Sequence, residues 1–189
     1  MLLLVVFFVM LIAYSSIDSE RMMSLKITKK VEHVTPAPPQ GMGKAMQALQ
    51  QMTNDSDMKN VFSIQNTEAG FKAVIPNPVL FASGDATLNE AIYPILDGII
   101  TIARNNDLAI QVEGHTDNQP IETARFPSNW ELSTMRAVNI LRYMQSGSGI
   151  PSNRLVAIGF AEYRPVADND SPEGRGKNRR IEIIFRRAT

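Results

Sequence analysis

The sequence predicts a two-layer α+β domain in which helices pack on a mixed sheet. Segments of alternating apolar residues, typical of half-buried strands, are interleaved with segments whose apolar residues recur every three or four positions, as in amphipathic helices. From residue 44 the predicted order is helix, two strands, helix, strand, helix, strand, loop and strand. The chain has 189 residues, the length of one ordinary domain with appendages.

The composition excludes several classes of protein. The 19 basic and 19 acidic residues cancel, so no overall attraction to nucleic acid is expected and no nucleic-acid partner is predicted. The chain has no cysteine, which excludes disulfides, thiolate catalysis and thiolate-bound metals. Only His33 and His115 are available as imidazole ligands, so a zinc site of the hydrolase kind is not expected. No metal and no cofactor is predicted.

The first 14 residues are apolar without interruption, fewer than the ~20 that span a membrane as a helix. A signal peptide would carry a basic region, which is missing, and a buried core helix would not be apolar on all sides. We therefore interpret residues 1–17 as the distal part of a membrane helix that starts upstream of this chain.

Residues 18–43 are predicted to be a linker. Residues 18–32 are polar with interleaved apolar side chains, which fits either an amphipathic helix on the membrane surface or a solvated continuation of the membrane helix. Residues 35–43 hold three prolines and two glycines, which interrupt both helices and strands. The folded domain is therefore predicted to span residues 44–189.

A helix and a hairpin are expected at the start of this domain. Residues 44–52 place their apolar side chains on one helical face. Residues 61–75 alternate around a turn at residues 68–70, the pattern of two antiparallel strands joined by a tight connection.

The next predicted elements are a helix and a strand. Thr87 and Glu90 have the spacing of a capping box, and the helical period follows over residues 92–103. Pro94 lies inside this run, so it is expected either to kink the helix or to move its start later. Residues 108–112 alternate as a half-buried strand that leads into a Gly-His-Thr-Asp turn.

The last predicted elements are a helix and two strands. Ser128 and Glu131 form a second capping box, and Gly147 and Gly149 end the helix that follows. One face of this helix is predicted to carry Thr134, Ala137, Val138, Leu141 and Met144. The remaining segments are predicted as a strand at 155–160, a loop at 161–177 and a strand at 181–185.

Four motifs occur in the second half of the chain: VEGHTDNQPI at 112–121, FPSNWELSTMRA at 126–137, RLVAIGFAEYRPVADN at 154–169 and GRGKNRRIEI at 174–183. Together they resemble the OmpA-like C-terminal domain, over about residues 61–187. The longer loop between the first two motifs and the apolar N-terminal residues resemble the MotB branch of this family, the B subunits of flagellar stators.

This resemblance implies that the domain binds peptidoglycan without cleaving it. In related domains an aspartate and an arginine hold the zwitterionic diaminopimelate of a stem peptide, and the matching residues are Asp117 and Arg136. The chemistry is sound, because a carboxylate accepts hydrogen bonds from the ligand ammonium and a guanidinium binds a carboxylate through two parallel hydrogen bonds. The peptidoglycan-binding residues implied are Thr116, Asp117, Asn129, Leu132, Arg136 and Arg179.

The sequence also leaves open a purely structural role for each candidate binding residue. Asp117 also suits the cap of a turn, and Arg136 also suits an exposed helix position. Purely structural roles are likewise open for Asn129, for Trp130 and for one of Arg179 and Arg180.

An enzyme was considered because Glu113 and Asp117 flank the Gly-His-Thr turn, and paired carboxylates are typical of glycosidases. The strand alternation, however, points Glu113 away from the core, and no apolar pocket that would raise a carboxyl pKa is evident. There is also no nucleophile elbow or phosphate-binding loop. The chain is predicted not to be an enzyme, and His115 is expected to hydrogen-bond within the turn.

For the whole protein, the resemblance implies a single-pass inner-membrane protein with a periplasmic C-terminal domain. The implied partners are peptidoglycan, a MotA-type channel subunit and a second copy of the chain, and residues 18–43 would serve as a linker or plug segment. The ion-carrying aspartate of the family's membrane helix has no match before Asp18, so the chain is expected to be N-terminally truncated. The alternatives are a non-motor envelope protein that links the inner membrane to peptidoglycan, and a regulatory or secretion scaffold.

Overall fold

The computed structural model describes residues 42–54, 62–146 and 148–188. The predicted partial membrane helix at residues 1–17 lies outside this part of the chain, as does the predicted linker at 18–43 except for its last two residues. None of the helices in the described part has both the length and the apolarity needed to cross a membrane.

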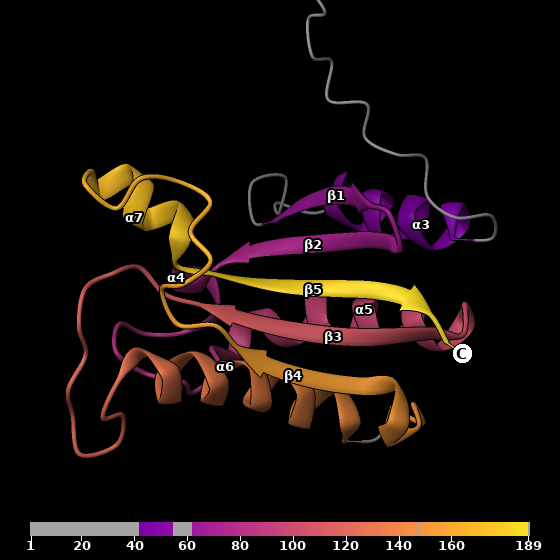
Figure 1. Cartoon of the computed structure of the whole chain (residues 1–189). Helices are drawn as coiled ribbons and strands as arrows, with labels where there is room; N and C mark the ends of the chain where they lie inside the picture. Colours follow the sequence, from indigo (N-terminus) through magenta and orange to yellow (C-terminus); the bar gives the residue numbers. More distant parts are fainter. Residues whose placement is uncertain (1–41, 55–61, 147, 189) are drawn as a thin grey trace, which may run out of the picture. The chain divides into compact units, whose positions relative to one another are not determined.

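A five-stranded mixed sheet lies at the centre of the domain, in the order β1-β2-β5-β3-β4 (Figure 1). The strands are β1 (Ser63–Thr67), β2 (Gly70–Pro76), β3 (Leu108–His115), β4 (Leu155–Gly159) and β5 (Arg180–Arg187). β3 and β4 run parallel, and the other neighbouring pairs are antiparallel. The predicted hairpin is confirmed as the β1–β2 pair.

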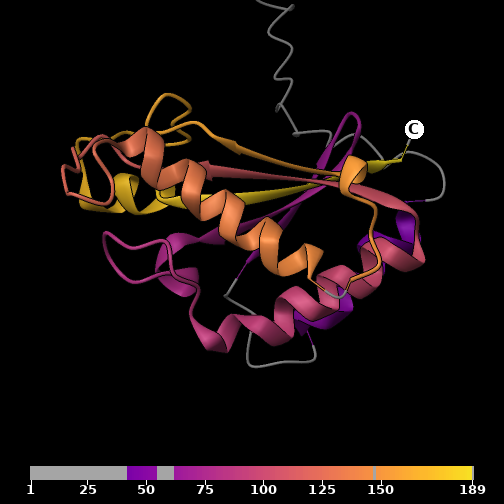
Figure 2. The ribbon, with the colours of Figure 1, turned by 90° about the horizontal axis from the view of Figure 1, so that it is seen from below.

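Helices α5 and α6 lie along one face of the sheet, and α3 packs against α5 (Figures 1 and 2). The helices are α3 (Gly43–Asn54), α4 (Asn77–Leu80), α5 (Tyr93–Asn105), α6 (Asn129–Gln145) and α7 (Pro172–Asn178), with short 3-10 turns η1 (Glu90–Ile92) and η2 (Ser152–Arg154). The prediction of a two-layer α+β domain with a mixed sheet is confirmed.

The core lies between the sheet and these helices, where the alternating strand residues meet the periodic helix residues. Val112 of β3 and Ile183 of β5 are fully buried, and the rings of Phe71 and Phe185 stack with centroids 4.6 Å apart. Fully burying a large aliphatic side chain contributes roughly 1.5–3 kcal/mol. The predicted apolar stripe of α5 is confirmed by the buried residues Ile95, Leu96, Ile99, Ile100 and Ala103.

The predicted capping box at Thr87 and Glu90 is wrong. The cap is Asn89, whose side-chain oxygen accepts a hydrogen bond from the backbone N–H of Ala91 at 3.2 Å. Asparagine caps a helix start at least as well as threonine, so the sequence held two competing start signals. Pro94 lies in the first turn of α5, where its missing N–H costs no hydrogen bond, so it delays the helix.

The cap predicted at Ser128 is confirmed. Its hydroxyl oxygen accepts from the backbone N–H of Trp130 at 3.2 Å and donates to the Glu131 carboxylate at 2.5 Å. The face that α6 buries, however, differs from the prediction. Thr134 is exposed, whereas the polar residues Ser133 and Arg136 are buried. Periodicity identifies only apolar faces, so it misses Arg136, which lines a cavity, and Ser133, whose hydroxyl bonds to the backbone of Trp130 and Ala161.

The segment predicted as a loop at residues 161–177 ends in a short helix. α7 begins after Ser171, whose hydroxyl accepts from the backbone N–H of Gly174 at 3.0 Å. Pro172 stands in the first turn, where proline is compatible with a helix. The segment was predicted as a loop because it is rich in Pro, Asp, Asn and Gly, but Pro172 with the Ser171 cap marks a helix start.

Two glycines bring the beginning of α6 close to the sheet. Gly114 of β3 and Gly159 of β4 are paired across the parallel strands. A Cβ on Gly114 would clash with the backbone of Ser133, and one on Gly159 would clash with Thr134. Because neither glycine has a side chain, the first turns of α6 lie directly on the strand ends, next to the turn that follows β3.

Candidate binding site at the ends of strands β2 and β3

Three segments that are remote in the sequence meet at one end of the sheet, where the central strands β2 and β3 finish and β5 begins. Arg180 at the start of β5 pairs with Pro76 at the end of β2 and with His115 at the end of β3. The residues that follow β2, those that follow β3 and Arg179 just before β5 therefore lie together. The N–H of Asn77 donates to the Arg179 carbonyl at 2.9 Å, and the Asn77 side chain donates to the His115 carbonyl at 3.0 Å.

A cavity of about 530 Å³ opens at this end of the sheet, between the three segments and the start of α6. All six residues that the sequence singled out lie in its wall: Thr116, Asp117, Asn129, Leu132, Arg136 and Arg179. The sequence did not anticipate the opposite wall, which consists of Asn77, Pro78, Phe81, Ala82, Ser83 and Gly84. The only available signal there was the Pro-Asn-Pro punctuation after β2.

Asp117 carries the negative charge of the cavity. Its Oδ2 lies 2.6 Å from Nη1 of Arg179, and its Oδ1 accepts from the backbone N–H of Gln119 at 3.2 Å. The carboxylate is therefore a turn cap, as the sequence left open, and also part of the cavity wall. Its side chain is nearly buried while that of Arg179 is partly exposed, so the pair borders the cavity with the arginine on its open side.

Arg136 holds the opposite wall in place. Its Nε donates to the Asp85 carbonyl at 2.8 Å, its Nη2 reaches the Ala82 carbonyl at 3.4 Å, and its guanidinium lies 5.1 Å from the centroid of the Phe81 ring. Burial lowers the pKa of Arg136 to about 10, against the opposing influence of Asp85 and Asp117. The group therefore remains charged at neutral pH.

The other predicted residues shape the turn that follows β3. The Asn129 side chain donates to the Gln119 carbonyl at 3.0 Å, and the Thr116 hydroxyl donates to the Asp117 carbonyl at 2.9 Å. Leu132 packs in a small apolar cluster beside the cavity. Of the two consecutive arginines, Arg179 lines the cavity and Arg180 is buried on the other face of the sheet.

The charges of the cavity suit a ligand with both a carboxylate and an ammonium group. Asp117 is the one carboxylate in the wall, facing the guanidinium groups of Arg136 and Arg179. A carboxylate accepts hydrogen bonds from an ammonium, and a guanidinium binds a carboxylate at two points. Such charge-assisted hydrogen bonds contribute about 1.5–3 kcal/mol each.

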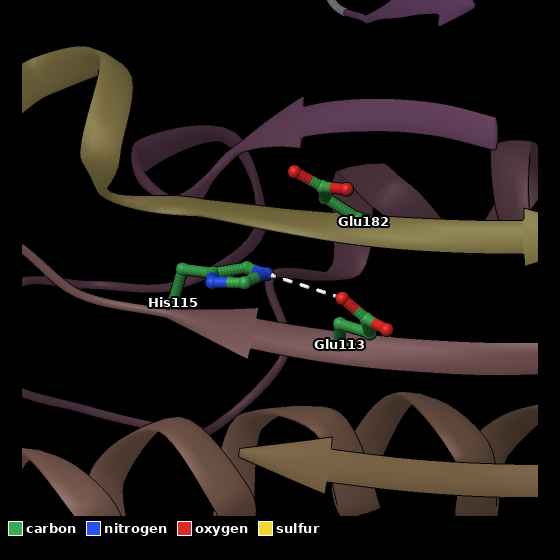
Figure 3. Close-up of side chains that lie close together, drawn as sticks. All are labelled: Glu113, His115 and Glu182. Carbon is green, nitrogen blue, oxygen red and sulfur yellow. Dashed lines mark ion pairs between the residues drawn. The ribbon is translucent and has the colours of Figure 1, made fainter. Parts of the chain in front are cut away.

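A second group of polar side chains lies on the sheet face opposite α5 and α6 (Figure 3). Glu113, His115 and Glu182 are all buried, with potential ligand atoms within 4.8 Å of one another. His115 Nε2 lies 3.6 Å from Glu113 Oε2, and its ring stacks on Phe160 at 5.4 Å. His115 takes part in hydrogen bonding here through its carbonyl, which accepts from the Asn77 side chain, whereas its two ring nitrogens have no hydrogen-bond partner among the described residues.

The charges of this second group are already balanced. Glu182 accepts from Lys72 Nζ at 2.7 Å and from Arg180 Nε at 2.6 Å, and the Gln111 side chain donates to Glu113 at 2.5 Å. Two carboxylates thus face two cations, and a bound divalent cation would add buried charge without a partner. We therefore assign no metal to this group.

Burial acts to raise the pKa values of both carboxyls, but the attraction of neighbouring polar and charged groups outweighs it. The His115 ring and the Gln111 amide hold the pKa of Glu113 below its ordinary value, and Lys72 and Arg180 do the same for Glu182. Glu113 faces away from the helices, as its strand alternation predicted, although it is buried. It does not line the cavity with Asp117, so the two carboxylates do not form a catalytic pair.

Comparison with known sequences places this domain among relatives. A model of the OmpA family matches residues 80–179. Protein YtxE of Bacillus subtilis is 37% identical over 134 residues, 71% of this chain and 55% of that protein. Motility protein B of the same organism is 34% identical over 138 residues, 72% of this chain and 53% of its own length. The chain thus spans about half the length of these two relatives.

A more distant relative and two solved structures agree with this result. Peptidoglycan-binding protein ArfA of Mycobacterium tuberculosis is 31% identical over 118 residues, 62% of this chain and 35% of that protein. A MotB-like protein from Desulfovibrio vulgaris superposes with a TM-score of 0.70 at 31% identity, over 77% of this chain and 93% of its own. The cell wall anchor of the T6SS from Pseudomonas aeruginosa gives 0.67 at 33% identity, over 75% and 97%.

The names of these relatives are those of motility, binding and anchoring proteins, in agreement with the prediction that the chain is not an enzyme. The family model covers just over half of the chain, and both Bacillus relatives exceed 30% identity over more than two thirds of it. Sequence motifs, fold and relatives lead to one conclusion: this chain belongs to the OmpA family.

Proposed function

We propose that this chain anchors an inner-membrane complex to peptidoglycan without cleaving it. In this proposal the periplasmic domain takes a diaminopimelate-containing stem peptide into the cavity at the ends of β2 and β3. The observation that carries the proposal is the arrangement of opposite charges in one cavity wall, Asp117 on one side and Arg136 and Arg179 on the other.

The ammonium and carboxylate groups of the second amino-acid centre of diaminopimelate each have a counterpart in the cavity wall. The ammonium group binds the carboxylate of Asp117, and the neighbouring carboxylate binds the guanidinium of Arg136. Arg179 is already paired with Asp117, and its partial exposure allows it to turn toward a second ligand carboxylate. A stem peptide without the second amino-acid centre would leave these charges without partners and bind more weakly. Thr116, Asn129 and Leu132 hold the turn and helix that carry the charges.

The relatives support this function. One bears the name of a peptidoglycan-binding protein, and one of the similar solved structures is a cell wall anchor. The finer proposal is that the anchored complex is a flagellar stator, in which this chain forms a homodimer and pairs with a MotA-type channel subunit. The likeness to motility protein B over 72% of the chain favours it.

The same domain also suits a non-motor protein that links the inner membrane to peptidoglycan. The likeness to the T6SS anchor, at an identity close to that of motility protein B, favours this second candidate. In both proposals residues 1–17 belong to a membrane helix, residues 18–43 span toward the wall, and residues 44–189 bind it. Co-purification of a MotA-type subunit with the chain from its native membrane would support the stator, and an envelope complex without a channel subunit would support the alternative.

Wall binding is tested by co-sedimentation of the full chain, kept in a zwitterionic detergent, with purified peptidoglycan sacculi. The variants are Asp117→Asn, which keeps the size of the side chain and removes its charge, and Arg136→Lys, which keeps the charge and removes the guanidinium that binds a carboxylate at two points. Loss of one charge-assisted contact of about 1.5–3 kcal/mol weakens binding by roughly 10- to 100-fold. The matched control is Arg142→Lys, an exposed arginine on the same helix, which should pellet like the native chain.

Circular dichroism spectra of the soluble fractions check that each variant is folded. Pelleting of the native chain and the control, with loss of both cavity variants, supports the proposal. Equal pelleting of folded Asp117→Asn, Arg136→Lys and native chain would show that the wall is bound elsewhere.

A further inference from the structure

Two aromatic side chains form an exposed pair beside the cavity. Trp130 in the first turn of α6 is 46% exposed, and Tyr163 in the segment after β4 is 65% exposed. Their rings stack with centroids 5.2 Å apart and planes inclined by 21°. Large aromatic rings are seldom left in water together without a partner, and Trp and Tyr are enriched at binding surfaces. We call Trp130 and Tyr163 the aromatic platform.

The platform is attached to the cavity by a short chain of hydrogen bonds. The Ser133 hydroxyl donates to the Trp130 carbonyl at 3.1 Å and accepts from the backbone N–H of Ala161 at 3.1 Å. The Ala161 carbonyl in turn accepts from the backbone N–H of Thr116, a residue of the cavity wall, at 2.9 Å. Ser133 is fully buried, so the backbones that carry both rings are held in place before any ligand arrives.

The platform and the cavity differ in the chemistry they offer. The cavity wall carries three charges, whereas the platform carries none and presents aromatic faces. The face of an aromatic ring is electron-rich and attracts weakly positive C–H groups. The C–H groups on one side of a pyranose ring have this character, while the hydroxyl and acetamido groups around the ring edge stay in water. The platform therefore suits an uncharged sugar ring.

We propose that the aromatic platform is a second subsite that binds an N-acetylated amino sugar of the glycan strand. This inference rests on the proposed function, because a stem peptide is covalently attached to its strand. A peptide held in the cavity brings the sugars of that strand next to the protein surface, and Trp130 directly follows Asn129 of the cavity wall. The cavity would then bind the stem peptide and the platform would bind the glycan strand of the same polymer.

Tryptophan fluorescence tests this inference directly, because Trp130 is the only tryptophan of the chain. The full chain is kept in a zwitterionic detergent, since a detergent with a sugar headgroup would compete for the platform. It is titrated with a soluble chitooligosaccharide, which has N-acetylglucosamine units and no peptide. In a second titration, calorimetry follows the binding of a free stem peptide that contains diaminopimelate.

The expected result is a saturable change of Trp130 emission with the oligosaccharide. Tyr163→Ala should weaken this binding by about tenfold, as expected for loss of one aromatic contact, and leave stem-peptide binding unchanged. The control is Val166→Ala, another exposed apolar residue of the same segment, which should bind both ligands like the native chain.

The two titrations separate failure of this inference from failure of the proposed function. Stem-peptide binding without any oligosaccharide response overturns the aromatic subsite and leaves the cavity proposal standing. An oligosaccharide response without stem-peptide binding supports the subsite and overturns the cavity proposal. If Tyr163→Ala changes the mass of the protein in light scattering and not its sugar binding, the platform is a contact between copies of the chain and the inference is overturned.

Discussion

Two groups of charged side chains lie at the same end of the sheet, but one serves the stability of the fold and the other lines the candidate binding cavity. On the face away from the helices, Lys72 and Arg180 bind Glu182 so closely that each charge has a partner inside the protein. In the cavity, Asp117 also has a partner, the partly exposed Arg179, but this pair and Arg136 line the cavity wall. The difference shows how a small domain can separate stability from recognition: enclosed ion pairs hold the fold, and in our proposal the charges that line the cavity bind the ligand.

The largest expected effect on stability comes from breaking the neutralised group. Glu182→Ala leaves Lys72 and Arg180 close together, without the carboxylate between them. Removing one partner of a buried ion pair costs about 3–5 kcal/mol, and we expect the free energy of unfolding to fall by that order. Urea unfolding followed by circular dichroism measures it. A loss below about 1 kcal/mol would mean that solvent screens this group as it screens surface pairs.

The next largest effect comes from lifting α6 off the sheet. Gly114→Ala introduces a Cβ that clashes with the backbone of Ser133, which displaces the helix and the cavity residues it carries. Overpacking of this kind costs about 1–3 kcal/mol. We expect lower thermal stability together with loss of sacculus binding. Gly149→Ala, at a glycine with no atom near its Cβ position, should leave sacculus binding intact, although its positive φ adds local strain.

A third prediction concerns pH. The pKa values of Glu113 and Glu182 are lower in the folded protein than their ordinary value, so the unfolded chain binds more protons on acidification. Their contribution to stability is therefore complete above pH 4.5, the ordinary pKa, and is lost as the pH falls through the folded-state values. Urea midpoints from pH 7 to pH 3 should decrease, and Glu182→Gln should flatten this slope. An unchanged slope in the variant would contradict the assignment.

The smallest effect on stability is expected in the cavity. Asp117→Asn removes an ion pair whose arginine is substantially exposed, and such pairs contribute about 0–1 kcal/mol. The same change is expected to abolish most sacculus binding. Unfolding and binding measured on one preparation test the comparison: a large loss of stability in Asp117→Asn would make this residue structural, like Glu182.

The sequence indicated much of the fold and the near wall of the cavity. The hairpin, the apolar stripe of α5 and the cap at Ser128 followed from local patterns, because each depends on neighbouring residues. The six candidate binding residues were found through motif resemblance, and they meet in one cavity. The far wall after β2 was missed, since apart from its prolines that segment carries no pattern that differs from an ordinary connection.

Local patterns misled where a polar group was buried. The inner face of α6 contains Ser133 and Arg136, which a search for apolar periodicity counts as exposed. Asn89 and Thr87 offered competing helix starts, and only the path of the chain decided between them. The short helix α7 was mistaken for a loop because residues 161–177 are rich in Pro, Asp, Asn and Gly, and a proline fits a loop as well as a helix start.

By itself the sequence determined the five strands and the three longer helices α3, α5 and α6, because alternation, helical period and capping act between residues close along the chain. The tertiary structure decided which charges are neutralised and which remain for a ligand. Lys72 and Glu182 are 110 positions apart and meet through the register of β2 and β5. The Coulomb energy of two charges depends on their distance in space and on the surrounding medium, and folding sets both.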